Sequence, residues 1–268
     1  MQATLDTLVM NDKKIPLVEM FGPTIQGEGA VIGQQTYFLR FGLCDYKCKM
    51  CDSMNAVDPK QVKANAEFLT QEEILEKFMA FWKPNSTRWI TFSGGNPCIH
   101  DLTSLVAALK QEGFKIAVET QGTFAPAWLE KCDIVTCSPK GPGMGEKTDF
   151  VVLDDFLSQG YQHFPYGLNL KVVIFDQRDL EFAKSVQERY VRYNLPFYLS
   201  LGNPYPPGLS PSPHESSLSD GMKHMTHMQI LIDRYKMLFE DIQTDPTLSQ
   251  MRFLPQWHTF VWGNAKGK

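Results

Sequence analysis

Residues 44–51 read Cys-Asp-Tyr-Lys-Cys-Lys-Met-Cys, so one short segment holds three of the six cysteines in the 268-residue chain. The CxxxCxxC spacing follows closely on an apolar run, Thr36–Phe41, that predicts a β-strand. A cubane iron–sulfur cluster has four irons that are usually held by thiolates, so three thiolates on one loop leave one iron open. An open position distinguishes a catalytic metal site from a structural one. The segment therefore predicts a [4Fe–4S] cluster held by Cys44, Cys48 and Cys51.

Two alternatives compete with a cluster at these cysteines. The first is a zinc ion held by three cysteines and a histidine, but the nearest histidine in the sequence is His100. Structural zinc sites also usually carry paired CxxC segments, whereas this chain has one triplet. The second alternative is a coincidental clustering of core cysteines. The scattered cysteines Cys98, Cys132 and Cys137 are interpreted as small buried hydrophobic residues.

Composition narrows the class of protein. Hydrophobic residues make up 43% of the chain and charged residues 21%, as in ordinary globular proteins. The net charge of −4 gives no basic surplus for nucleic acid. The first residues, MQATLDTLVMNDKK, lack an apolar signal core, and no apolar run approaches membrane-spanning length. We therefore expect a cytoplasmic protein with no nucleic-acid or membrane partner and with reduced thiols rather than disulfides.

Short β-branched runs alternate with amphipathic stretches along the chain. The predicted strands are Thr36–Phe41, Trp89–Phe92, Lys115–Glu119, Asp133–Thr136, Leu168–Phe175 and Phe197–Leu201. The predicted helices are one that begins after a capping box of Thr70 and Glu73, one between an N-cap at Asp101 and Gly113, and two at about 179–190 and 223–241. Such alternation implies right-handed βαβ units and a parallel sheet.

About six parallel strands are too few for a closed eight-stranded barrel. We therefore predict an α/β fold with a partial, open (β/α) barrel. No linker or internal repeat divides the chain, so residues 1–268 are expected to form a single domain. The Pro/Ser-rich stretch at about 203–221 is interpreted as a long surface loop.

A second motif, Ser93-Gly-Gly-Asn-Pro97, ends a predicted strand and precedes a helix. Paired glycines there allow a ligand to approach the backbone, at the sheet edge where parallel α/β folds bind ligands. Alone, such a pair usually marks a turn. After a CxxxCxxC segment, however, it resembles the SAM-binding turn of radical-SAM enzymes, with Asn96 in place of the usual Glu. The resemblance implies a radical-SAM barrel that binds S-adenosylmethionine (SAM) at the open iron, where an electron from the cluster releases a 5′-deoxyadenosyl radical.

Further motifs are spread over nearly the whole chain. They are FGPTIQGEG at 21–29, Cys51-Asp-Ser53, Val118-Glu-Thr-Gln-Gly122, Ser138-Pro-Lys140, Leu170-Lys-Val-Val-Ile174, and Leu254–His258 with Trp262-Gly-Asn264. Together they resemble the 7-carboxy-7-deazaguanine synthase family. The resemblance implies a lyase that converts 6-carboxy-5,6,7,8-tetrahydropterin to 7-carboxy-7-deazaguanine with loss of ammonia, in the queuosine pathway of tRNA modification. It also implies Mg²⁺, a homodimer, and a flavodoxin- or ferredoxin-like electron donor.

The same resemblance assigns roles to individual residues. The pterin pocket would be lined by Ile25, Gln26, Gly27, Glu28, Arg40, Ser93 and His258. SAM would be held by Gly95, Glu119, Ser138, Pro139 and Lys140. Glu28, Arg40 and His258 are the candidate catalytic residues: Glu28 would accept from the donor edge of the ring, and Arg40 would clamp the carboxylate. Ser53 is the candidate magnesium ligand.

Alternatives and departures remain at several positions. His258 could be a core or dimer-interface histidine, and Glu119 a strand-end carboxylate satisfied by its neighbours. Met50 stands where radical-SAM loops usually carry an aromatic residue, Ser53 stands where Thr is frequent, and residues 199–205 differ from some family members. The rival functions are a glycyl-radical-enzyme activase and a non-catalytic metal-binding protein.

Overall fold

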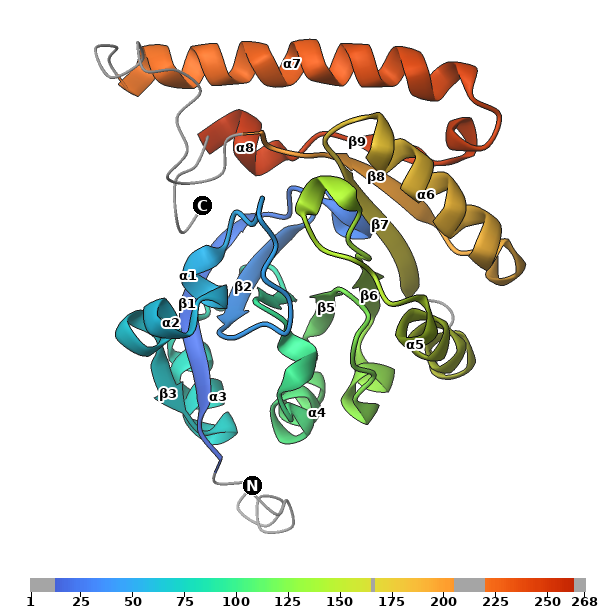
Figure 1. Ribbon diagram of the computed structural model, residues 1–268. Helices are drawn as coiled ribbons and strands as arrows, with labels where there is room; N and C mark the ends of the chain where they lie inside the picture. Colours follow the sequence, from blue (N-terminus) through green and yellow to red (C-terminus); the bar gives the residue numbers. More distant parts are fainter. Residues whose placement is uncertain (1–12, 165–166, 205–219, 263–268) are drawn as a thin grey trace.

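The computed structural model describes residues 13–164, 167–204 and 220–262, with the backbone alone for 220–226. These ranges contain one nine-stranded sheet in the order β3-β1-β2-β4-β5-β6-β7-β8-β9 (Figure 1). Its strands are β1 (Ile15–Ile25), β2 (Gln35–Phe41), β3 (Glu67–Leu69), β4 (Trp89–Gly94), β5 (Lys115–Thr120), β6 (Ile134–Cys137), β7 (Leu168–Ile174), β8 (Phe197–Leu201) and β9 (Arg252–Leu254). Strands β2 and β4 to β9 are parallel, while β1 and β3 are antiparallel additions at one edge.

Eight α-helices lie in the described ranges. They are α1 (Met54–Val57), α2 (Pro59–Asn65), α3 (Gln71–Phe81), α4 (Thr103–Gln111), α5 (Phe150–His163), α6 (Gln177–Tyr190), α7 (Asp220–Thr244) and α8 (Trp257–Trp262). Helices α3 to α6 follow one another around the outside of the curved sheet, and α7 lies along β8 and α8 (Figure 1). The described edge strands β3 and β9 do not pair with each other, so the predicted open barrel is confirmed.

All six predicted strands are present and parallel, and three further strands were missed. Two of them, β3 and β9, have only three residues each, too few to show a period. The third, β1, is irregular, with register shifts between Leu17 and Glu19 and between Phe21 and Thr24. Such irregularities break the alternation by which a strand is found in a sequence.

The helix ends follow the predicted capping chemistry with two differences. The box at Thr70 is confirmed, since its hydroxyl accepts from the Glu73 amide at 3.2 Å. Helix α4 begins at Thr103 rather than next to Asp101, although the Asp101 carboxylate still accepts from the Thr103 amide at 3.1 Å. Helix α6 begins two residues earlier than predicted because Asp176 forms a capping box that the prediction missed.

The remaining expectations concern the other helices, the Pro/Ser-rich loop and membrane-spanning segments. Helices α1, α2, α5 and α8 were not predicted, and most of the predicted 203–221 loop, residues 205–219, lies outside the described residues. No helix in the described ranges combines the length and apolar character that a membrane span needs.

The two faces of the sheet differ sharply in polarity. On one face, side chains such as Ile90, Val118 and Leu170 belong to the hydrophobic core. Side chains alternate across a strand, so the residues between them point to the other face. These alternate residues are mostly polar and mostly buried: Thr91, Ser93, Glu119, Thr136, Asn169, Lys171 and Ser200. The inner face of the open barrel is therefore a polar surface enclosed by protein.

Candidate active site

A cavity of about 540 Å³ lies over the polar face, near the carboxyl ends of the parallel strands. Its lining includes nearly every residue singled out from the sequence: Ile25, Gln26, Gly27, Glu28, Arg40, Cys44, Cys48, Cys51, Ser53, Ser93, Gly95, Glu119, Ser138, Lys140 and His258. Pro139 is buried and is not part of the lining. The lining also contains Asp52, Lys171, Asn203 and Gln256, for which no role was predicted.

The three clustered cysteines lie on the loop that follows β2, and all three are free thiols facing the cavity. Three thiolates on one loop are a donor set that fits an iron–sulfur cluster with one iron left open.

Burial opposes ionisation of these thiols in the absence of a metal. It raises the pKa of Cys48 to about 11 and that of Cys51 to about 12, and it also raises the pKa of Cys44. A bound cation stabilises the thiolate and reverses this preference. Three buried thiols on one loop are thus suited to a positively charged metal centre.

Gly94 and Gly95 are required by the packing of the turn itself, whether or not a ligand binds beside it. A Cβ atom on Gly94 would lie 1.9 Å from the Phe41 carbonyl oxygen, and one on Gly95 would lie 1.9 Å from the Leu43 carbonyl oxygen. Only glycine allows the turn to pack this tightly against the backbone that leads into the cysteine loop. The amides of Gly95 and Asn96 donate to the same two carbonyls at 3.0 and 2.8 Å.

Ser93, beside this turn, carries a buried hydroxyl for which the described residues provide no hydrogen-bond partner. Ser93 lines the cavity. Buried polar atoms are rarely left unpaired, and each exception calls for an explanation such as a ligand. The Ser93 hydroxyl is therefore available to a molecule bound in the cavity.

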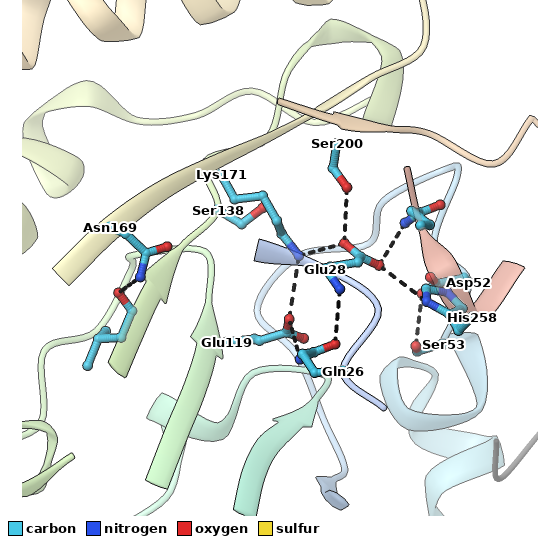
Figure 2. Close-up of polar contacts among 12 residues, drawn as sticks. Gln26, Glu28, Asp52, Ser53, Glu119, Ser138, Asn169, Lys171, Ser200 and His258 are labelled. Atoms are coloured by element: carbon cyan, nitrogen blue, oxygen red, sulfur yellow. Dashed lines mark hydrogen bonds and ion pairs between the residues drawn. The ribbon is translucent and has the colours of Figure 1, made fainter. Parts of the chain in front are cut away.

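Glu28 is the centre of the polar network, as Figure 2 shows. Its carboxylate accepts from Lys171 Nζ at 2.7 Å, from Gln256 Nε2 at 2.8 Å and from Ser200 Oγ at 3.5 Å. Nδ1 of His258 lies 3.9 Å from the same carboxylate. Burial alone would raise the pKa of Glu28, but the charge of Lys171, the electrostatic interaction with His258 and the hydrogen bonds from Lys171 and Gln256 lower it to about 2. Glu28 is therefore an anion inside the protein.

Lys171 connects Glu28 to the predicted SAM side of the cavity. Its Nζ lies 2.7 Å from Glu28 and 3.5 Å from Glu119 Oε1. Burial alone would lower the pKa of Lys171, but the two carboxylates raise it above its usual value. Glu119 also accepts from Gln26 Nε2 at 3.3 Å (Figure 2). It is thus partly satisfied by protein, as the alternative interpretation held, yet it lines the cavity.

A second set of hydrogen bonds in the cavity joins Arg40 to Ser53. Arg40 Nε donates to Glu19 Oε2 at 2.7 Å, and Nη1 donates to the Ser53 hydroxyl at 3.1 Å. The Ser53 hydroxyl donates to Asp52 Oδ1 at 2.9 Å. Although Ser53 is the N-cap residue of α1, its side chain makes no capping hydrogen bond. Its hydroxyl therefore belongs to the site rather than to the helix end.

Asp52 belongs to a compact group of three potential metal ligands. Asp52, Glu28 and His258 each place a ligand atom within 4.8 Å of the other two. Carboxylate and hydroxyl oxygens are the ligands that Mg²⁺ prefers, so the oxygens of Asp52 and Ser53 fit a magnesium ion. Asp52 was not among the predicted site residues, although it follows the third cysteine directly.

The Gln26–Glu28 turn is fixed by the C-terminal segment. The Trp257 amide donates to the Gly27 carbonyl oxygen at 3.1 Å, and a Cβ atom on Gly27 would lie 2.7 Å from His258 Nδ1. Glycine is therefore needed at position 27 for His258 to lie against the turn. Two segments from opposite ends of the sequence form this wall of the cavity.

The fold and the cysteine loop define a radical-SAM enzyme, and the Radical SAM superfamily model matches residues 39–136. As a member of that superfamily, the chain uses a [4Fe–4S] cluster and SAM. It is 38% identical to 7-carboxy-7-deazaguanine synthase of Bacillus subtilis, over 95% of this chain and 99% of the relative. It is 37% identical to that of Bacillus cereus, with the same coverage. The chain belongs to the 7-carboxy-7-deazaguanine synthase family.

A solved structure supports the fold independently. The crystal structure of QueE from Escherichia coli superimposes with a TM-score of 0.57 at 21% identity, covering 91% of this chain and 94% of that one. At such low identity the match concerns the fold alone. The predicted family, fold class and enzyme class are thus confirmed.

Proposed function

We propose that this enzyme converts 6-carboxy-5,6,7,8-tetrahydropterin to 7-carboxy-7-deazaguanine and ammonia, as a step of queuosine biosynthesis for tRNA modification. One observation carries the proposal beyond family membership: a single cavity contains the three cysteines, a cation at Arg40 and an anion at Glu28. A carboxylated pterin offers the complementary groups, because it has a carboxylate at one end and N–H donors at the other.

The cysteine side of the cavity would hold the cofactors. Cys44, Cys48 and Cys51 are proposed to bind the cluster, and with three protein ligands they would leave one iron open for SAM. When bound, the cluster and SAM would supply the radical chemistry that the hydrogen abstraction needs. The residues proposed to hold SAM are Gly95, Glu119, Ser138 and Lys140, with buried Pro139 shaping the loop behind them. The Lys140 ammonium already donates to the Ser138 hydroxyl at 3.0 Å, which orders this wall.

Arg40 is proposed to bind the substrate carboxylate. A guanidinium presents five N–H donors in a rigid plane, and the contacts to Glu19 and Ser53 engage two of its nitrogens. Bidentate pairing with a carboxylate would fix the orientation of the pterin as well as its position. Glu19 also holds the guanidinium in place before the substrate arrives.

Glu28 is proposed to accept from the ring N–H groups of the pterin, beside Ile25, Gln26 and Gly27. A carboxylate has about four lone-pair sites, so the contacts from Lys171, Gln256 and Ser200 leave capacity for a ligand. The low pKa of Glu28 keeps it an acceptor at neutral pH. His258 is proposed to contact the substrate; it lines the cavity and is one-third exposed, which disfavours a core role.

Magnesium, assembly and electron supply complete the proposal. Ser53, next to Asp52, is proposed as a Mg²⁺ ligand. A homodimer is supported by apolar side chains exposed on α7, among them Met237 and Phe239.

A flavodoxin- or ferredoxin-like protein is proposed as the electron donor. The enzyme is proposed to work in the cytoplasm, where its six free thiols stay reduced. We further propose that residues 1–268 form one radical-SAM domain, since one sheet spans all the described ranges.

The decisive test is turnover by enzyme reconstituted with iron and sulfide without oxygen. We expect the carboxypterin, SAM, Mg²⁺ and a reductant to yield 7-carboxy-7-deazaguanine and ammonia, measured by mass spectrometry, with SAM recovered intact. A glycyl-radical-enzyme activase would cleave SAM and leave the pterin unchanged. A non-catalytic metal-binding protein would do neither, and either result would refute the proposal.

A further inference from the structure

Asn96, at the position where the SAM-binding turn usually has Glu, is fully buried and fully hydrogen-bonded. Its Nδ2 donates to Asp45 Oδ1 at 2.9 Å and to Thr123 Oγ1 at 3.1 Å. Its Oδ1 accepts from the Cys98 amide at 3.2 Å and from the Thr120 hydroxyl at 3.0 Å. An Asn side chain has two donors and two acceptor sites, so this residue uses all of them.

Asp45 is the residue directly after the first cluster cysteine. Its Oδ1 accepts from Asn96 and also from Gln121 Nε2, so two neutral amides hold one carboxylate. The same Gln121 nitrogen lies 3.5 Å from Cys44 Sγ. Side-chain contacts therefore run from the glycine turn through Asp45 and Gln121 to the Cys44 sulfur.

The pairing makes the residue type at position 96 depend on the residue at position 45. A carboxylate at position 96 would face the Asp45 carboxylate at hydrogen-bonding distance, with no proton between the two oxygens. Like charges at that distance in a partly buried site repel strongly. An amide at position 96 instead donates the hydrogen bond that Asp45 needs.

We infer that Asn96 is a positioning residue whose amide, together with Gln121, fixes Asp45 and thereby sets the place of Cys44 relative to the glycine turn. Asn96 and Asp45 thus act as a matched pair. The inference rests on the proposed role of Cys44 as a cluster ligand, but it does not depend on the identity of the substrate.

Exchanging the pair tests the inference. Asn96→Asp places two carboxylates together, whereas Asn96→Asp with Asp45→Asn restores one donor and one acceptor in reversed order. The hydroxyls of Thr120 and Thr123 can donate to an aspartate, so the exchange leaves their bonds possible. The matched control is Asn96→Asp with Glu146→Gln. Glu146 accepts from the Lys47 amide at 2.7 Å, so it contacts the same loop without facing Asn96.

The main measurement is the rate at which Cys44 is alkylated in the metal-free protein, followed by mass spectrometry. We expect Asn96→Asp to raise the rate constant per thiolate, obtained from the dependence of the rate on pH, about tenfold or more, as for the loss of a hydrogen bond to a charged group. Iron bound per chain after reconstitution should fall in parallel. Adding Asp45→Asn should return both values close to those of the wild type, and adding Glu146→Gln should not.

The inference is overturned if Asn96→Asp changes neither value, if the exchanged pair behaves like Asn96→Asp alone, or if Glu146→Gln rescues equally well. Should Asn96→Asp fail to fold, thermal unfolding gives the same comparison: the exchanged pair must recover the folded state, and the control pair must not. Cys44→Ala separates this question from the proposed function. Full iron binding by that variant would refute the ligand role of Cys44, whereas alkylation tests the pairing without any metal.

Discussion

The cysteine side and the Glu28 side of the cavity are built in opposite ways. Cys44, Cys48 and Cys51 lie within eight consecutive residues, on one loop after one strand. Glu28 instead takes its hydrogen bonds from Lys171, Ser200 and Gln256, which are 143, 172 and 228 positions away in the chain. The first site is a local property of the sequence, and the second exists only once the whole sheet and the C-terminal segment are in place. Damage to the two sides should therefore have different consequences.

The largest expected effect is on the cysteine side. Cys48→Ala removes one of three thiolates, so bound iron, its visible absorption and SAM cleavage should all be lost. The chain should still fold, because the metal-free loop is held by backbone hydrogen bonds such as that from the Lys49 amide to the Met144 carbonyl at 2.8 Å. Cys132→Ala is the matched control, since Cys132 is a buried core residue outside the cavity lining. Equal loss of iron in both variants would contradict the ligand assignment.

The same contrast explains what could be predicted from the sequence. The cysteine spacing, the glycine turn and the six main strands depend on neighbouring residues, so their patterns are visible in short windows. The partners of Glu28 depend on strand order, because β7 and β8 follow β6 in the sheet. No short window contains that information.

One missed residue could have been found. Lys171 alternates with the core residues Leu170 and Val172 in β7, so period-2 reasoning places it on the opposite face, where a buried cation needs an anionic partner. Gln256 and Asp52 gave weaker signals. The docking of His258 against Gly27 depends on how the C-terminal segment folds back, and nothing local to either residue predicts it.

The next effect, on the Glu28 side, is a loss of stability. Lys171→Met leaves the Glu28 carboxylate buried without its cation, and breaking a buried pair in this way typically costs ~3–5 kcal/mol. We expect that decrease in the free energy of unfolding, measured with urea. Lys184→Met is the control, because its pairs with Glu181 and Asp245 lie near the surface and should contribute little to stability. Similar losses in the two variants would show that Glu28 is not held as described.

The pH dependence of stability should also identify Glu28. Its pKa is about 2 in the folded protein and 4.5 in the absence of the fold, so the ionised form stabilises the protein above pH 4.5. That contribution, on the order of 3 kcal/mol, is lost as the pH falls from 4.5 towards 2. The difference in unfolding free energy between wild type and Glu28→Gln should therefore shrink over this window. A difference that stays constant between pH 6 and pH 3 would contradict the assignment.

A smaller effect is expected at Arg40, where the two sides meet. Arg40→Lys keeps the charge and loses the planar pair of donors, so binding of the carboxypterin should weaken by about 2 kcal/mol, at the lower end of values for disrupting a buried charged pair. SAM binding should hardly change. Both affinities can be measured by calorimetry on reconstituted enzyme without reductant. Normal affinity for the pterin in Arg40→Lys would exclude a role as carboxylate clamp.

The smallest effect concerns magnesium at the border of the two sides. The Ser53 hydroxyl makes no helix cap and instead lies between Arg40 and Asp52, so its removal should affect a ligand rather than the helix. Mg²⁺ usually takes only one or two protein oxygens and keeps waters and substrate oxygens as its other ligands. Turnover by wild type should rise with Mg²⁺ after treatment with a chelator. Ser53→Ala should need more Mg²⁺ for the same rate and keep its iron, while Ser53→Thr should behave like wild type.

Asp52 provides the comparison that sharpens this last prediction. Its carboxylate accepts from Ser53 and lies within ligand distance of Glu28 and His258, so it could bind the ion directly or merely orient the Ser53 hydroxyl. If Ser53 is the ligand and Asp52 orients it, Asp52→Asn keeps an acceptor oxygen and should shift the Mg²⁺ response less than Ser53→Ala does. If Asp52 is itself the ligand, the loss of its charge should shift the response more. Titrations of turnover in the two variants decide between these roles, and unchanged Mg²⁺ responses in both would remove magnesium from this part of the site.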